Sequence, residues 1–235
     1  MKYNFFRICF FSFLFLLTDF RYISIDKYSG SYSVLSEAIM STSVGYNNLF
    51  LIVGIVVTSL YVFGLSNILI ESPLILIKCG KNRFYNKNIK NIFFDSLLIA
   101  IEYVGIIVAF CLCFFDITLL YDSGFFLCVL LYCAMLCMYF FTVGSVTLLI
   151  KILMGSKIYV FVSAVIFFVL AALQNSASHF SPVYFCNFVD RWFLLGKFDI
   201  IDYVKDLMIC LLYILIAILF GKLTFSKKDF WHEQT

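Results

Sequence analysis

Two long stretches without a charged side chain restrict what this chain can fold into. Residues 49–70 give 22 consecutive uncharged positions, and residues 123–150 give 28. At ~1.5 Å of rise per residue, the shorter stretch makes about 33 Å of helix, enough to cross the hydrocarbon layer of a bilayer. Of the 235 residues, 63% are hydrophobic and 13% are charged, more apolar surface than a soluble domain can cover. These properties exclude soluble enzymes, nucleic-acid-binding proteins and disordered proteins.

The remaining apolar stretches complete a single predicted domain, residues 1–235, that is all-α: a polytopic membrane bundle of six transmembrane helices. The predicted spans are residues 8–25, 49–70, 92–115, 123–150, 158–173 and 207–225. The first span is the weakest, because only 11 uncharged residues separate Arg7 from Asp19. It is similar to a signal peptide but lacks a small-residue cleavage site, so we interpret it as an uncleaved span.

Two connecting segments are long enough to describe. Residues 26–48 are predicted to form a polar loop rich in serine and tyrosine. Residues 181–206 mix apolar patches with charges, which predicts a short interfacial or re-entrant helical piece with Trp192 at the depth of the lipid head groups.

The distribution of basic residues predicts the orientation. With the N-terminus inside, twelve lysines and arginines fall on the cytoplasmic side and five on the outer side. The inner set is Lys2, Arg7, Lys78, Lys81, Arg83, Lys87, Lys90, Lys151, Lys157, Lys222, Lys227 and Lys228. Because basic residues concentrate on the cytoplasmic side of membrane proteins, we expect a multi-pass protein of the cell membrane with both termini in the cytoplasm.

The motifs that enzymes of this size require are missing. No Gly-Lys pair has the spacing and the following Ser or Thr of a phosphate-binding loop, and neither H-E-x-x-H nor G-x-S-x-G occurs. Cys133 and Cys137 share a helix face, but neither of the two histidines is near them in sequence, so we expect no metal site. The prediction is a protein that is not an enzyme, with no catalytic residues and no cofactor.

Residues 72–91, between the second and third predicted spans, contain five basic residues and no acid: Lys78, Lys81, Arg83, Lys87 and Lys90. A loop beside two spans collects such residues to fix topology and to contact anionic membrane lipid. The alternative is a docking element, in which a short helix along the inner surface presents Arg83, Phe84 and Tyr85 to a soluble partner. The residues alone leave both interpretations open.

The same segment carries a family resemblance. The matching residues are Ile75, Ile77, Lys78, Gly80, Arg83, Phe84, Tyr85 and Lys87. They fit the pattern I-x-I-[RK]-x-G-x-x-[RK]-[FW]-[YW]-x-K, and with the six predicted spans the chain resembles the small ABC-2-type permeases of low-GC Gram-positive bacteria. Several of these are linked to bacteriocin or lantibiotic self-immunity and to peptide efflux. Cys79 stands where the family more often has tyrosine.

The resemblance implies a function and partners. It implies a permease subunit of an ABC exporter in the bacterial cytoplasmic membrane, which moves a peptide, antimicrobial or other amphipathic compound. ATP hydrolysis would occur on a separate ABC ATPase chain, and a second permease copy or a sister permease would complete the transporter. The family's coupling segment corresponds to residues 72–91. The residues implied to contact the ATPase are Lys78, Gly80, Lys81, Arg83, Phe84, Tyr85 and Lys87.

Three polar residues inside the predicted spans are candidates for a translocation path: Glu102, Asp95 and Asn67. Glu102 lies about 15 Å deep in the third span, and Asp95 is seven residues earlier on nearly the same face. Ionisable groups at such depth usually face the bundle interior and have a function. The alternative is structural, with Glu102 hydrogen-bonded to Tyr61 or Asn67 of the second span.

Other functions compete with an exporter subunit. A non-transport immunity or sensor protein that binds a peptide at its outer loops fits the same composition. A secondary transporter is disfavoured because the spans show no internal duplication, and a lipid-modifying enzyme because histidine and aspartate do not cluster.

Overall fold

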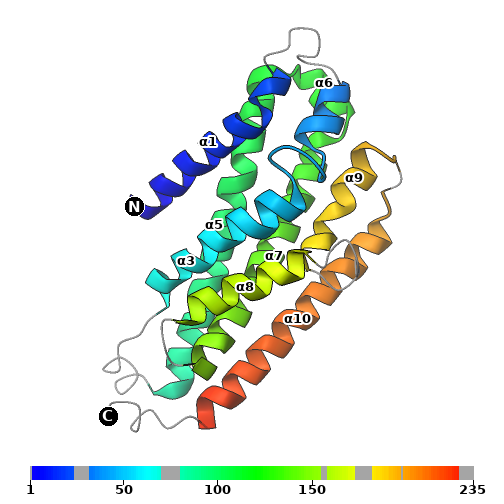
Figure 1. Cartoon of the computed structure of the whole chain (residues 1–235). Coiled ribbons are helices and arrows are strands. Elements are labelled where there is room, and N and C mark those ends of the chain that lie inside the picture. Colours follow the sequence, from blue (N-terminus) through cyan, green and yellow to red (C-terminus); the bar gives the residue numbers. More distant parts are fainter. Residues whose placement is uncertain are drawn as a thin grey trace.

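The computed structural model describes residues 2–23, 32–69, 80–154, 158–172, 182–196 and 198–227, and within these ranges every regular element is helical (Figure 1). The long elements are α1 (Lys2–Ile23), η2 (Leu49–Val57) with α3 (Thr58–Ile68), α5 (Lys81–Phe114), α7 (Phe125–Met154), α8 (Ile158–Ala172) and α10 (Ile200–Lys227). The short elements are α2 (Tyr32–Val34), η1 (Leu35–Ile39), α6 (Ile117–Asp122), η4 (Pro182–Asn187) and α9 (Phe188–Phe193). The all-α prediction is confirmed for the described residues.

Four helices in the described part of the chain are long and apolar enough to cross a bilayer. They are Leu49–Ile68, Lys81–Phe114, Phe125–Met154 and Ile200–Lys227, and α8 is a shorter apolar helix of 15 residues. These helices support the prediction of a membrane protein. The six-span arrangement stays a prediction.

The long helices alternate in direction (Figure 1). The α1 helix runs parallel to α5, because Phe11 packs on Tyr103 and Phe15 on Phe110, while the η2–α3 segment runs against α5. Further along the chain, α7 runs parallel to η2–α3, α8 returns in the opposite direction, and α10 runs beside α7. At one end of the bundle, α3, α7 and α10 finish and α5 and α8 begin. We call this the basic end, and we call the opposite end the α9 end.

The η2–α3 segment begins at a side-chain cap. The Asn48 side chain accepts a hydrogen bond from the Leu51 amide at 2.7 Å, which satisfies a donor that a helix start leaves open. The first nine residues are π-helical, and the turn changes to α-helix at Thr58. The Thr58 hydroxyl lies 2.7 Å from both the Val53 carbonyl and the Tyr139 hydroxyl, so this junction is tied to α7.

Close helix contacts depend on small residues in the centre of the bundle. A Cβ built at Gly144 of α7 would overlap the Ile92 side chain of α5 and lie 2.7 Å from the Tyr61 hydroxyl of α3. Glycine at this position therefore lets three helices approach one another, as small residues commonly do in membrane bundles.

Some predicted boundaries differ from the observed ones. The α5 helix begins at Lys81 rather than at residue 92, and α10 begins at Ile200 rather than at residue 207. Hydropathy detects the apolar part of a helix, whereas lysine, arginine and asparagine continue the helix at modest cost outside it. The α7 helix likewise continues to Met154 beyond the predicted end at residue 150. The predicted limits at residues 25, 70 and 173 lie outside the described residues.

The predicted polar loop at residues 26–48 has more structure than expected. Its described part contains α2 and η1, followed by a turn in which Tyr46 and Asn47 are fully buried. The predicted interfacial segment 181–206 contains the short helices η4 and α9, and then the first two turns of α10.

Candidate functional site

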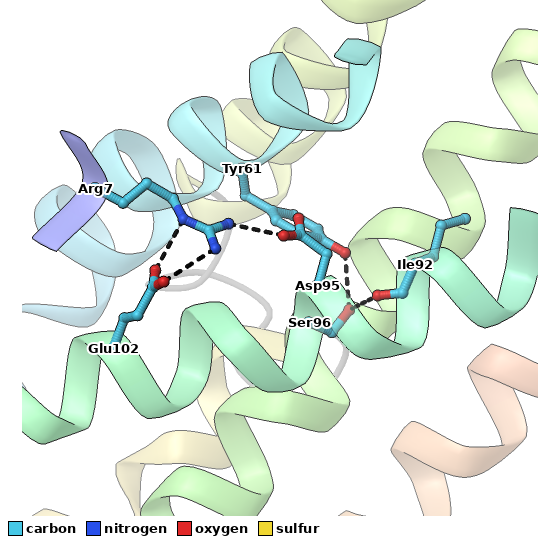
Figure 2. Close-up of polar contacts among 6 residues, drawn as sticks. All are labelled: Arg7, Tyr61, Ile92, Asp95, Ser96 and Glu102. Atoms are coloured by element: carbon cyan, nitrogen blue, oxygen red, sulfur yellow. Dashed lines mark hydrogen bonds and ion pairs between the residues drawn. The ribbon is translucent and has the colours of Figure 1, made fainter. Parts of the chain in front are cut away.

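A group of three charged side chains lies buried between α1 and α5 (Figure 2). The Arg7 guanidinium donates from Nη1 to Oδ1 of Asp95 at 2.9 Å. It also contacts Glu102 twice, from Nε to Oε2 at 2.8 Å and from Nη2 to Oε1 at 3.2 Å. The exposed fractions of the three side chains are 0%, 9% and 8%. We call these residues the charged triad.

Local structure explains how the triad forms. Asp95 and Glu102 are seven residues apart on α5, two helical turns, and therefore lie on the same face. The aromatic contacts of Phe11 and Phe15 of α1 with α5 set the register of the two parallel helices. In this register Arg7 lies between the two carboxylates, as Figure 2 shows.

The oxygens of the two carboxylates are not equivalently bound. Glu102 Oε1 accepts a hydrogen bond from Nη2, and Oε2 lies 2.8 Å from Nε, an ion-pair distance without hydrogen-bond geometry. Asp95 uses Oδ1 alone, and its buried Oδ2 has no hydrogen-bond partner among the described residues. Arg7 therefore interacts with the two acids unequally.

A neutral hydrogen-bond chain lies next to the triad. The Tyr61 hydroxyl of α3 lies 2.8 Å from the Ser96 hydroxyl, which donates to the Ile92 carbonyl at 2.7 Å (Figure 2). The structural alternative predicted a hydrogen bond between Tyr61 and Glu102. In the structure Tyr61 is bonded to Ser96 instead. Asn67 is exposed near the end of α3, and the structure does not bring it to the triad.

Sequence reasoning did not find the role of Arg7. The topology prediction counted Arg7 among surface cations at the start of a span, whereas the structure buries it completely. One signal was available: two acids inside an apolar helix need a cation, and Arg7 is a basic residue at the edge of the least certain span.

The predicted ATPase-contact residues divide into exposed and buried groups. Arg83 and Lys87 are exposed on the first turns of α5, and Gly80, with a φ of +77°, precedes the helix. Phe84 and Tyr85 are buried against α10. Phe84 stacks on Phe225, and the Tyr85 hydroxyl donates to the Ile218 carbonyl at 2.9 Å.

The two aromatic residues therefore join α5 to α10, whereas Arg83 is exposed, and contact of these residues with an ATPase stays a prediction. Lys81 adds to this junction by donating from Nζ to the Ser226 carbonyl at 3.3 Å. Lys78 lies outside the described residues.

The α9 end contains a second polar cluster, which the sequence did not reveal. The Thr42 amide donates to Oδ1 of Asp190 at 2.8 Å, and the Thr42 hydroxyl bonds to both Asp190 and Asn187. A neighbouring pair continues the network: the Tyr46 amide donates to Asp19 at 3.0 Å, and the Tyr103 hydroxyl donates to the Tyr46 carbonyl.

Two titratable groups in these connecting segments have shifted pKa values. Burial, together with the neighbouring Tyr103 and Asp19, raises the pKa of the Tyr46 phenol well above its ordinary value. Burial also raises the pKa of the Cys186 thiol well above its ordinary value, with smaller contributions from Cys210 and Asp206. Both side chains are therefore neutral near pH 7.

The two ends of the bundle differ in charge, counted over the side chains that the structure describes. The basic end carries seven cations and no acid: Lys81, Arg83, Lys87, Lys90, Lys151, Lys222 and Lys227. The α9 end carries two cations, Arg191 and Lys205, and eight acids: Asp19, Glu37, Asp116, Asp122, Asp190, Asp199, Asp202 and Asp206. In the described ranges, no group of three His, Cys, Asp or Glu could hold a metal ion.

Comparison of this chain with models of known protein families, with curated proteins and with solved structures gives no match.

Proposed function

We propose that this chain is the membrane-embedded permease subunit of an ABC exporter, with six spans, both termini in the cytoplasm and ATP hydrolysis on a separate chain. The observation that carries the proposal is the charge difference between the two ends of the bundle. The basic end would lie in the cytoplasm by the positive-inside rule. The alternating directions of six helical segments are compatible with this topology, and α1 and α8 would then be the two crossings in addition to the four long apolar helices.

The position of α5 supports a link to an ATPase. Its first turns present Arg83 and Lys87 to the cytoplasmic side, while Phe84 and Tyr85 hold the same turns against α10. A partner that moved the exposed face would move α5 and α10 together. In this proposal the contact face is Arg83 and Lys87, with Asn82 and Asn86 beside them, all of which are exposed.

The proposed assembly contains two permease domains, from a second copy of this chain or from a sister permease. The transported compound would be a peptide, an antimicrobial or another amphipathic molecule. The cell membrane of a bacterium is the proposed location.

Co-purification tests the partner. The tagged chain is isolated in mild detergent from the cells that make it, and co-purifying proteins are examined for the sequence G-x-x-x-x-G-K-[ST]. We expect such an ATPase with the wild type and its loss with Arg83→Glu combined with Lys87→Glu. Lys205→Glu, an exposed charge reversal at the α9 end, is the matched control and should retain the ATPase. If the double variant still co-purifies with the ATPase, this face is not part of the interface.

Labelling tests the topology separately. Cysteines introduced at Lys87 and Asp199, both exposed, lie at opposite ends of the bundle. In intact cells, a membrane-impermeant maleimide should label the Asp199→Cys variant and should label Lys87→Cys only after the cells are opened. The reverse pattern would contradict the proposed orientation.

The cluster at the α9 end favours a second candidate function. In residues 40–48, Thr42 is hydrogen-bonded to Asn187 of η4 and to Asp190 of α9, which joins these segments on one face. A non-transport immunity or sensor subunit that binds a peptide there needs no ATPase. If this chain still protects cells against the peptide after the co-purifying ATPase is deleted, that result would favour this function over export.

A further inference from the structure

The charged triad is not balanced in charge. With all three groups ionised, two carboxylates face one guanidinium, and one negative charge remains on side chains that are less than a tenth exposed. A net charge enclosed by apolar helices is costly and is usually removed by pairing or by protonation. The triad therefore needs one further positive charge.

No second cation supplies this charge among the described residues. The groups around the two carboxylates come from four elements. Arg7 comes from α1, the Ser96 hydroxyl from α5 and the Tyr61 hydroxyl from α3. The last two bond to each other and are neutral, as is the Cys137 thiol of α7 near Tyr61. A proton on one carboxylate supplies the missing charge without a further side chain.

The geometry distinguishes the two acids as acceptors of that proton. Oε2 of Glu102, like Oδ2 of Asp95, makes no hydrogen bond with the described residues, but it lies 2.8 Å from Nε of Arg7, so protonation of Glu102 at Oε2 would weaken a close ion-pair contact. Asp95 contacts Arg7 through Oδ1 only, and Oδ2 is buried with no hydrogen-bond partner among the described residues. A neutral hydroxyl at that atom costs less than an unpaired charge.

We propose that Asp95 is a proton-binding site, which holds a proton on Oδ2 at neutral pH and makes the triad neutral overall. Arg7 and Glu102 then form the ion pair, and Asp95 accepts the Nη1 hydrogen bond as a neutral carboxylic acid. This assignment goes beyond the proposed export function, because it requires neither an ATPase nor a transported compound.

Infrared spectroscopy of the purified full-length chain in lipid nanodiscs tests the proposal. At pH 7 the wild type should show the carbonyl stretch of a protonated carboxylic acid. Part of this band, equal to one carboxyl group, should be lost in Asp95→Asn, which preserves the shape of the side chain. It should also be lost in Glu102→Gln, because Asp95 then becomes the sole counter-ion of Arg7 and ionises. Asp116→Asn, at an exposed aspartate, should leave the band unchanged.

Two results would overturn the proposal. The first is an unchanged band in Asp95→Asn. The second is a wild-type melting temperature that rises with Na⁺ or K⁺ at constant ionic strength while that of Asp95→Asn does not, since a metal cation would then hold the place of the proton. Either acid would ionise once the other is neutralised, so isotopically labelled aspartate in the wild type decides between Asp95 and Glu102, and it also serves if Asp95→Asn does not fold. The acid band should shift with the label, and a band that does not shift would reject Asp95.

Discussion

The two ends of this bundle use charged residues in opposite ways. At the α9 end, Asp190 bonds to Thr42, and Arg191 forms ion pairs with Asp206 at 3.3 Å and Asp202 at 3.6 Å. At the basic end, five cations are exposed and make no ion pair with the described residues: Arg83, Lys87, Lys90, Lys222 and Lys227. The named charges at the first end therefore hold segments together, whereas these five at the second are available to lipid or to another protein. A count of charges by sequence position does not show this difference.

The largest expected effect lies between the two ends, at the charged triad. Arg7→Gln leaves two buried carboxylates without their cation, and breaking a buried ion pair in this way costs about 3–5 kcal/mol. The measurement is unfolding of the purified protein in detergent. Arg83→Gln, at an exposed arginine of the basic end, is the matched control and should cost less than ~0.5 kcal/mol. Equal losses of unfolding free energy in the two variants would show that the burial of Arg7 does not make it more important for stability than the exposed Arg83.

A smaller loss is expected at the α9 end. Asp190→Ala leaves the Thr42 amide without its acceptor, whereas the Thr42 hydroxyl keeps its bond to Asn187, so we expect a cost of about 1–3 kcal/mol. Asp116→Ala is the control, because Asp116 is exposed and makes no side-chain cap bond to α6. Thermal unfolding should separate the two variants. If Asp190→Ala is as stable as the control, the network does not hold residues 40–48 in place.

The junction of α5 and α10 at the basic end gives the next effect. A Cβ added at Gly221 would lie 2.5 Å from the Tyr85 hydroxyl oxygen and 3.3 Å from its ring, and Tyr85 is held by its bond to Ile218. We expect Gly221→Ala to destabilise the fold by about 1 kcal/mol after its gain in helix propensity. Gly105→Ala, where the added Cβ meets nothing within 4 Å, should instead stabilise by about 0.5–1 kcal/mol. Stabilisation by both substitutions would mean that Tyr85 is free to move.

The smallest effect on stability is expected from the exposed cations. Arg83→Glu combined with Lys87→Glu should change the free energy of unfolding by less than ~0.5 kcal/mol, because neither side chain is buried. The same denaturation experiment measures it. A loss above ~1 kcal/mol would show that the basic end is tied by its charges in the same way as the α9 end.

Much of the fold could be predicted from the sequence because a long uncharged apolar stretch identifies a helix of spanning length. The predicted segments 49–70, 92–115, 123–150 and 207–225 each fall on a helix of spanning length. The boundaries could not be predicted equally well. Residues 81–91 are helical but polar, and their helical state depends on contacts of Phe84 and Tyr85 with α10 that no local pattern reveals.

The candidate site was predictable only in part. Asp95 and Glu102 could be identified because acids at membrane depth are rare and their spacing places them on one face. Their partner could not, since pairing with Arg7 depends on the tertiary register between α1 and α5. The Thr42–Asp190 contact joins residues 148 positions apart, so nothing local in the sequence predicts it.

The unbroken length of α5 has a mechanical consequence. Arg83 near its start and Glu102 along its length are about 28 Å apart if the helix is rigid. With the junction to α10 as a pivot, a tilt of about 10° would displace the neighbourhood of Glu102 by about 5 Å. This displacement would either move α1 together with α5 or separate the Arg7 guanidinium from its two carboxylates. A force applied at the start of α5 would then change an electrostatic contact in the interior of the bundle.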